Sequence, residues 1–257
     1  LVTLFHAINF QMGDGASAFH LTNVIVHGAC ALLVLALGRV LGLGASTAAI
    51  AALFFALHPL NTEVGAYVSS RSESLAAVGV LACITLYLRW RQTGSQKAYL
   101  FALAGLALSL LAKAVAVVAP VVLLALEACR RRRLPGTSEL LRIAPFAMLS
   151  GIYLLVVSSE ASKALGSPVR SLDVQAWTQA KALLYYLYLA MMPMHLSVEH
   201  RFSVSASPSE AVVAVAFATL VSLAVTLPRL LSRRALAAAS GGLLLLAPAS
   251  IVPLNVL

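Results

Sequence analysis

The stretch AYLFALAGLALSLLAKAVAVVAPVVLLALEA, residues 98–128, is an almost continuous apolar run. A single α-helix of this length would extend ~46 Å, whereas the hydrocarbon core of a bilayer is ~30 Å thick. Lys113 is the only charged residue near its middle. The stretch therefore predicts two successive apolar helices that turn at Lys113, and it indicates that lipid surrounds much of the chain.

The composition of the whole chain agrees with a lipid environment. Of the 257 residues, 61% are hydrophobic and 11% are charged, compared with about 25% charged residues in soluble domains. The net charge is +9, but the basic residues lie in short clusters between apolar runs, as in membrane proteins rather than nucleic-acid-binding ones. The three cysteines show neither metal-ligand spacing nor a disulfide framework.

Apolar segments recur along the chain and predict an all-α, polytopic transmembrane bundle with about eight spanning helices. These segments are 19–41, 45–60, 72–90, two within 98–128, 142–158, 207–227 and 235–256. Ser70 with Glu73, and Ser207 with Glu210, predict capped helix starts. A polar loop is expected over 159–175, and the aromatic stretch 177–194 is expected to be re-entrant or interfacial.

The basic clusters predict which connections face the cytoplasm. They are Arg39; Arg89, Arg91 and Lys97; Arg130, Arg131, Arg132 and Arg133; and Arg229, Arg233 and Arg234. The other connections then face outward, to the periplasm or lumen, and they carry most of the remaining ionisable groups. This outer set comprises His58, Glu63, Arg71, Glu73, Lys113, His195, Glu199, His200 and Arg201.

Two cations in the outer set are candidates for binding a lipid phosphate. Arg71 follows a polar stretch and could orient a phosphate, while Glu63 or Glu73 could supply a carboxylate. The structural alternative is a polar loop in which Glu73 is a capping residue. Lys113 lies in an apolar hairpin, where a charge is costly and favours function over simple snorkelling.

Two further polar groups are candidates for lining a site. His20, Asn23 and His27 share one helix face, where they could contact substrate or join helices by hydrogen bonds. Beside it, His58, Asn61 and Glu63 in the outer connection before Arg71 are also expected to line the site. The second group is His195, Glu199, His200 and Arg201. Its spacing matches no metal signature, so acceptor or headgroup contacts are favoured over metal binding.

Residues 58–63, His-Pro-Leu-Asn-Thr-Glu, followed by Arg71, resemble the HPxxTE…R signature of the transmembrane and tetratricopeptide-repeat O-mannosyltransferases and their bacterial relatives, which are GT-C-type glycosyltransferases. Other stretches resemble the same family and occur in family order over most of the chain. They are residues 1–5 (the end of YRPL), 19–27 (FHLxNxxxH), 112–113 (part of a KE pair), 192–200 (P-x-x-L-S-x-[DE]) and 251–257 (the run before RLYLPS).

The resemblance implies a sugar transfer from a polyprenyl- or dolichyl-phosphate donor to a protein or glycan acceptor at the outer face. Arg71 and Lys113 would hold the donor phosphate, and no cofactor is implied, although a divalent metal stays open. The family's catalytic base would lie before Leu1 and its repeats beyond Leu257, so we expect an internal fragment with one transmembrane domain. Ala114 stands where the family's acidic partner of the lysine would be.

Two other functional classes are considered beside this one. A lipid or solute transporter would place ionisable groups at the bilayer midplane and show inverted repeats, and the sequence shows neither clearly. A non-catalytic membrane scaffold would lack the catalytic acid. The Ala- and Leu-rich composition favours a bacterial inner membrane over the endoplasmic reticulum as the location.

Overall fold

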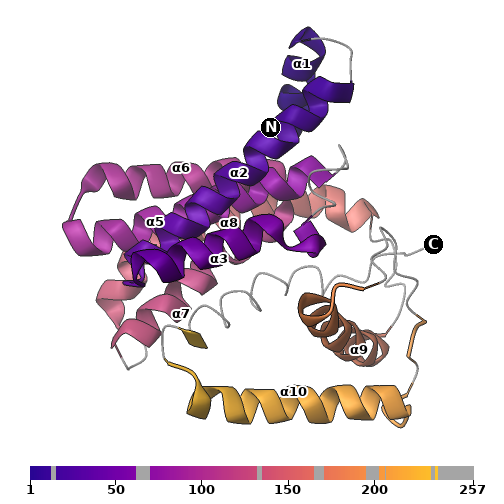
Figure 1. Cartoon of the computed structure of the whole chain (residues 1–257). Helices are drawn as coiled ribbons and strands as arrows, with labels where there is room; N and C mark the ends of the chain where they lie inside the picture. The colour runs from indigo at the N-terminus through magenta and orange to yellow at the C-terminus, as the bar shows by residue number, and fades with distance from the viewer. Residues whose placement is uncertain are drawn as a thin grey trace.

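The regular secondary structure of the described chain is entirely helical. The computed structural model describes residues 1–12, 16–61, 70–131, 135–164, 171–194, 203–205, 207–232 and 235–236. Its helices are α1 (Val2–Met12), α2 (Ala16–Val40), α3 (Ala45–Leu57), η1 (Pro59–Asn61), α5 (Arg71–Thr93), α6 (Gln96–Ala112), η3 (Ala114–Val118), α7 (Ala119–Arg131), α8 (Thr137–Ala164), α9 (Leu172–Met191) and α10 (Ala211–Leu230) (Figure 1). The predicted all-α class is confirmed.

Four helices are long and apolar enough to cross a membrane, which supports a membrane protein. They are Ser17–Val40, Arg71–Thr93, Thr137–Val157 and Ala211–Leu230. Large apolar side chains such as Leu32, Leu155 and Val221 are exposed on these helices, as lipid-facing residues would be. The other predicted crossings are the shorter helices α3, α6 and α7, or lie in 235–256, of which only 235–236 is described.

Helices α5 and α6 form a closely packed antiparallel hairpin (Figure 1). Gly94, in the left-handed conformation, ends α5, and the Ser95 hydroxyl caps α6. At Gly79 a Cβ would lie 2.6 Å from the carbonyl oxygen of Gly105, so only glycine permits this approach. The Ser109 hydroxyl also donates to the carbonyl of Ala76 at 2.7 Å.

The predicted helix break at Lys113 is confirmed. Helix α6 ends there, Lys113 takes an extended conformation (φ −157°, ψ 140°), and η3 leads into α7. The chain reverses direction: Lys113 meets the start of α5, and Glu127 of α7 meets the end of α5. However, α7 has 13 residues and would extend ~20 Å, less than a bilayer core.

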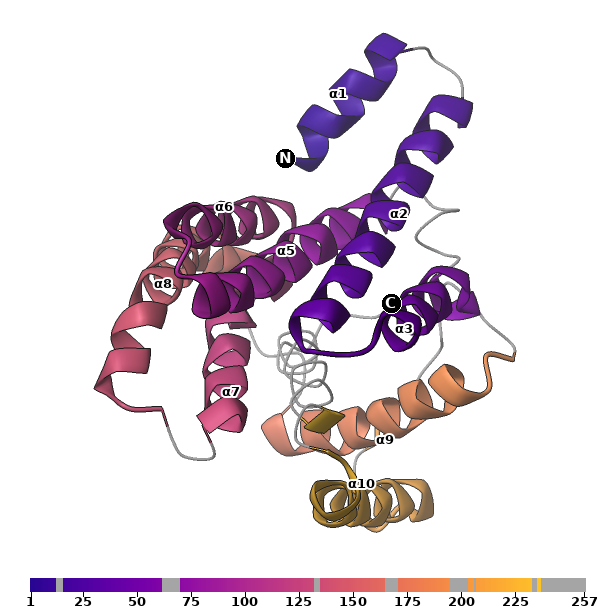
Figure 2. The ribbon, with the colours of Figure 1, turned by 60° about the vertical axis from the view of Figure 1, so that its left-hand side comes forward.

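The last three helices differ from the prediction in their bounds. Helix α8 continues to Ala164 and α9 begins at Leu172, so much of the predicted loop 159–175 is helical. Pro145 cannot donate an intrahelical hydrogen bond, and the ribbon of α8 bends in its first half (Figure 2). Helix α10 begins at Ala211, because residues 207–210 form a turn.

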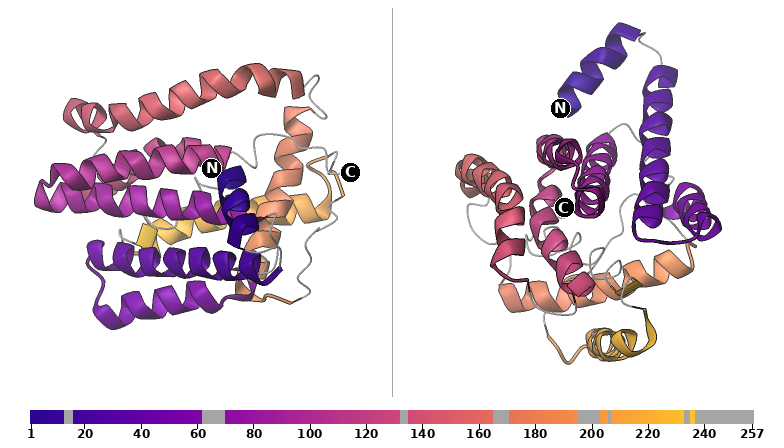
Figure 3. Two further views of the ribbon diagram at one scale, coloured as in Figure 1. Left: turned by 90° about the horizontal axis from the view of Figure 1, so that it is seen from above. Right: turned by 90° about the vertical axis from the view of Figure 1, so that its left-hand side faces the viewer.

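Helix α9 lies crosswise to the other long helices. It is seen end-on in Figure 1, where α5, α6 and α10 run across the view, and Figure 3 shows it crossing their direction. It packs against α10, with Trp177 and Phe217 in edge contact. Although α9 has 20 residues, it is not among the four candidate spans of the described chain. The re-entrant or interfacial placement that the sequence expects for 177–194 stays a prediction.

Candidate functional site

Polar contacts between helices gather at two opposite ends of α5. Near its start, Glu73 forms an ion pair with Lys113 at the end of α6. Near its end, Arg91 forms an ion pair with Glu127 of α7. We call these the Lys113 end (Asn9, Asn23, His58, Arg71, Glu73 and Lys113) and the Arg91 end (Tyr87, Arg91, Glu127, Glu139 and Arg142). The sequence assigns the first to the outer face and the second to the cytoplasmic face.

Lys113 and Glu73 form an ion pair that is open to its surroundings. The ammonium group of Lys113 donates to Oε1 of Glu73, and the two side chains are 42% and 56% exposed. The helix termini favour this arrangement, because Glu73 lies in the first turn of α5 and Lys113 follows the last turn of α6. The predicted Ser70–Glu73 capping box is wrong, since the Ser70 side chain makes no cap hydrogen bond.

Arg71 lies in the interior, although the sequence suggested a residue that holds phosphate. Its side chain is fully buried. Its guanidinium donates from Nε to Asn23 Oδ1 at 2.9 Å, from Nη1 to Asn9 Oδ1 at 2.6 Å and from Nη2 to the carbonyl of Phe19 at 3.0 Å. The Phe19 ring also lies against the guanidinium. Arg71 therefore joins α1 and α2 to α5, and phosphate binding by Arg71 stays a prediction.

The histidines and Asn61 make contacts with backbone carbonyls. His58, which ends α3, contacts the carbonyl of Ala190 in α9 through Nε2 at 3.1 Å. This contact links the crosswise helix to the Lys113 end. His27 contacts the carbonyl of Ala56 at 3.1 Å, and Asn61 donates to Phe55 at 2.6 Å, so both satisfy orphan carbonyls at the C-terminus of α3.

The remaining predicted site residues are distributed unevenly. His20 is exposed on α2, one turn from the buried Asn23. Glu63, His195, Glu199, His200 and Arg201 lie outside the described residues. In the described chain no group of three or more His, Cys, Asp or Glu side chains could hold a metal ion.

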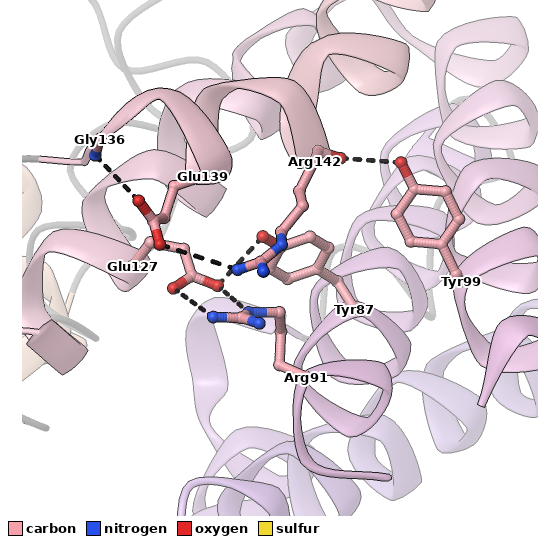
Figure 4. Close-up of polar contacts among 7 residues, drawn as sticks. All are labelled: Tyr87, Arg91, Tyr99, Glu127, Gly136, Glu139 and Arg142. Atoms are coloured by element: carbon pink, nitrogen blue, oxygen red, sulfur yellow. Dashed lines mark hydrogen bonds and ion pairs between the residues drawn. The ribbon is translucent and has the colours of Figure 1, made fainter. Parts of the chain in front are cut away.

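The Arg91 end contains a buried cluster of charged residues that the sequence analysis did not predict (Figure 4). Glu127, fully buried, accepts from Nε and Nη2 of Arg91 at 2.5 and 3.3 Å and from the Tyr87 hydroxyl at 3.1 Å. Beside it, Glu139 lies 3.7 Å from Arg142 and caps the start of α8 by accepting from the Gly136 N–H. The contacts of Glu127 with Tyr87 and Arg91 join α5 to α7. The Tyr99 hydroxyl of α6, which donates to the carbonyl of Arg142 at 2.8 Å, joins α6 to α8.

Sequence reasoning missed the network contacts of four residues, and each residue left a weak signal. Asn9 is one of several polar residues in the mainly apolar stretch 1–12. Tyr87 and Arg91 are four residues apart, so they share one helix face. Glu127 is an acid at the end of a long apolar run, where it needs a cationic partner. None of these signals names the partner, because the partners come from other helices.

Comparison with known proteins gives no match for this chain. The chain matches no protein-family model, no curated protein and no solved structure.

Proposed function

We propose that this protein is a membrane glycosyltransferase of the GT-C type, which moves a sugar from a polyprenyl- or dolichyl-phosphate donor to a protein or glycan acceptor. The observation that carries the proposal is the exposed Lys113–Glu73 ion pair. It lies at the same bundle end as His58 and Arg71, the residues of the HPxxTE…R resemblance. The family's lysine–acid pair lacks its acid at Ala114, and Glu73 supplies a carboxylate from the neighbouring helix instead.

In the proposed reaction Lys113 binds the phosphate of the donor, because an ammonium group attracts an anion near the membrane surface. Arg71 fixes α1 and α2 against the start of α5, close to Glu73 in sequence. His58 connects this end to α9, whose tyrosines suit the headgroup region. A base that deprotonates the acceptor hydroxyl is required, and the residues described here do not assign it.

The distribution of ionisable groups supports an enzyme over a transporter. The ion pairs of α5 lie near its two ends, at Glu73 and Arg91, while the segment between them packs with apolar and small residues such as Gly79, Val80 and Cys83. A transporter would place such groups near the middle of the membrane. A multi-pass protein of the bacterial inner membrane, with about eight crossings and the Lys113 end outside, is part of the proposal.

The proposal is tested by sugar transfer in membranes that contain the protein. Lys113→Ala is compared with Lys97→Ala, a matched loss of an exposed lysine at the predicted cytoplasmic side. Transfer of labelled sugar from polyprenyl-phosphate sugar to an acceptor should fall by at least tenfold in Lys113→Ala and stay near wild type in Lys97→Ala. Normal turnover of the Lys113 variant at wild-type expression would overturn the assignment.

A further inference from the structure

The exposed side chains of Lys113 and Glu73 can separate at little cost in free energy. Surface ion pairs contribute little, because water and salt compensate both charges when they separate. Both side chains are well exposed. The pair links the start of α5 to the end of α6 and lies outside the core. Arg71, only two residues from Glu73, is in contrast fully buried among three acceptors. At this end of the described bundle, Lys113 is therefore the cation that an incoming anion can reach.

We infer that Glu73 is an exchangeable counter-ion of Lys113, and that it favours the release of the lipid-phosphate product over the sugar-bearing donor. This inference rests on the proposed function. The donor is a phosphodiester with one negative charge, whereas the product, polyprenyl phosphate, is a monoester that carries nearly two. Glu73 competes with either lipid for the same ammonium group, and it repels the more highly charged product more strongly.

The balance of the reaction gives Glu73 this role. The bond between the anomeric carbon and the phosphate oxygen breaks, and its electron pair stays on that oxygen. A bond forms between the acceptor oxygen and the anomeric carbon, and the acceptor proton goes to the base. The phosphate thus gains one negative charge during transfer. A single lysine would hold the product more tightly than the donor unless a neighbouring carboxylate opposed it.

The size of the effect follows from electrostatics. One additional unit charge at about 4 Å from a carboxylate in water is repelled enough to weaken binding about fivefold. Replacing Glu73 with the neutral, nearly isosteric Gln should remove that discrimination. We therefore expect Glu73→Gln to lower the inhibition constant of polyprenyl phosphate about fivefold relative to the donor KM. Glu73→Asp, which keeps the charge, should restore much of the wild-type ratio.

The experiment measures initial rates of sugar transfer by the protein in nanodiscs, with added polyprenyl phosphate as product inhibitor. Asp173→Asn is the matched control: this exposed carboxylate lies in the first turn of α9, and hydrogen bonds from the Ser171 hydroxyl and the Val174 N–H hold its pKa below the usual value. It should leave the ratio unchanged. A parallel arm with inorganic phosphate separates the two sources of the anion, since weak inhibition by the free ion would show that the lipid is required.

The Glu73 and Lys113 variants distinguish a failure of the counter-ion role from a failure of the proposed glycosyltransferase function. An unchanged ratio of inhibition constant to donor KM in Glu73→Gln, with transfer still dependent on Lys113, overturns the counter-ion role alone. Transfer that persists in Lys113→Ala overturns the proposed function as well. If Glu73→Gln fails to elute as one species and so does not fold, the Glu73→Asp variant decides. A ratio fivefold below wild type despite its charge would also refute the inference.

Discussion

Neutralising Glu127 is expected to destabilise the protein more than removing the Tyr87 hydroxyl that donates to it. Glu127 is fully buried, and Arg91 is only 14% exposed, so solvent can compensate neither charge when the other is lost. Glu127→Gln keeps the volume and leaves one oxygen to accept from Tyr87, but the guanidinium of Arg91 then remains as a charge without its counter-ion. Breaking a buried pair in this way costs about 3–5 kcal/mol.

Two comparisons set the scale of this prediction. Tyr87→Phe removes one uncharged donor to the Glu127 carboxylate, and a hydrogen bond to a charged group contributes about 1.5–3 kcal/mol. The double variant Arg91→Gln with Glu127→Gln removes both charges, so it should cost less than the two single losses together. A coupling energy of about 2 kcal/mol between Arg91 and Glu127 is therefore expected from the double-mutant cycle.

The measurement is reversible unfolding in mixed micelles, titrated with a denaturing detergent and followed by circular dichroism. The four proteins of the cycle are compared with Tyr87→Phe under the same conditions. A loss below about 1 kcal/mol for Glu127→Gln, or costs that simply add in the double variant, would refute the buried ion pair as the fastening of α5 to α7.

Three further predictions address packing, the buried arginine and topology. Gly79→Val should separate α5 from α6, because its Cβ alone would lie 2.6 Å from the carbonyl oxygen of Gly105. We expect a loss of about 2–3 kcal/mol in the same unfolding assay, and wild-type stability would contradict the close approach. Arg71→Met should impair folding more than Asn9→Ala, because it leaves both asparagine oxygens without their buried donor; equal stability of the two variants would argue against the Arg71 network. Single cysteines at Lys113 and Arg39, in a background without native cysteines, should react with an impermeant thiol reagent from opposite sides of the membrane, and labelling from one side would contradict the alternation.

Much of the architecture could be predicted because it depends on properties that add along the chain. The apolar run 98–128 must be broken in a bilayer, and a single lysine in its middle is the least costly place for the break. The segregation of basic residues at one set of connections likewise follows from transfer energies and charge, residue by residue. The interfacial placement of α9 rests on its aromatic residues and on the side that the basic clusters predict for Arg229, and it stays a prediction.

The side-chain partners at the ends of helices could not be predicted in this way. Ser70 with Glu73 carries the signature of a capping box, yet the Glu73 carboxylate is paired with Lys113 instead. A local pattern states what a side chain can do with its own helix. It does not include the ion pair with Lys113, forty positions away, which competes for the same carboxylate. That partner is known only from the packing of α5 against α6.

The sequence by itself determined the helical class of this protein and the break at Lys113, and it predicted a lipid environment and the candidate residues of one membrane face. Only the tertiary structure decided which of those residues face a ligand and which hold helices together. Arg71 and Lys113 look equivalent as cations in the sequence, but one is buried among Asn9, Asn23 and Phe19 while the other is exposed beside Glu73. Burial and partnership depend on which helices become neighbours, and that is a property of the packed chain rather than of any single segment.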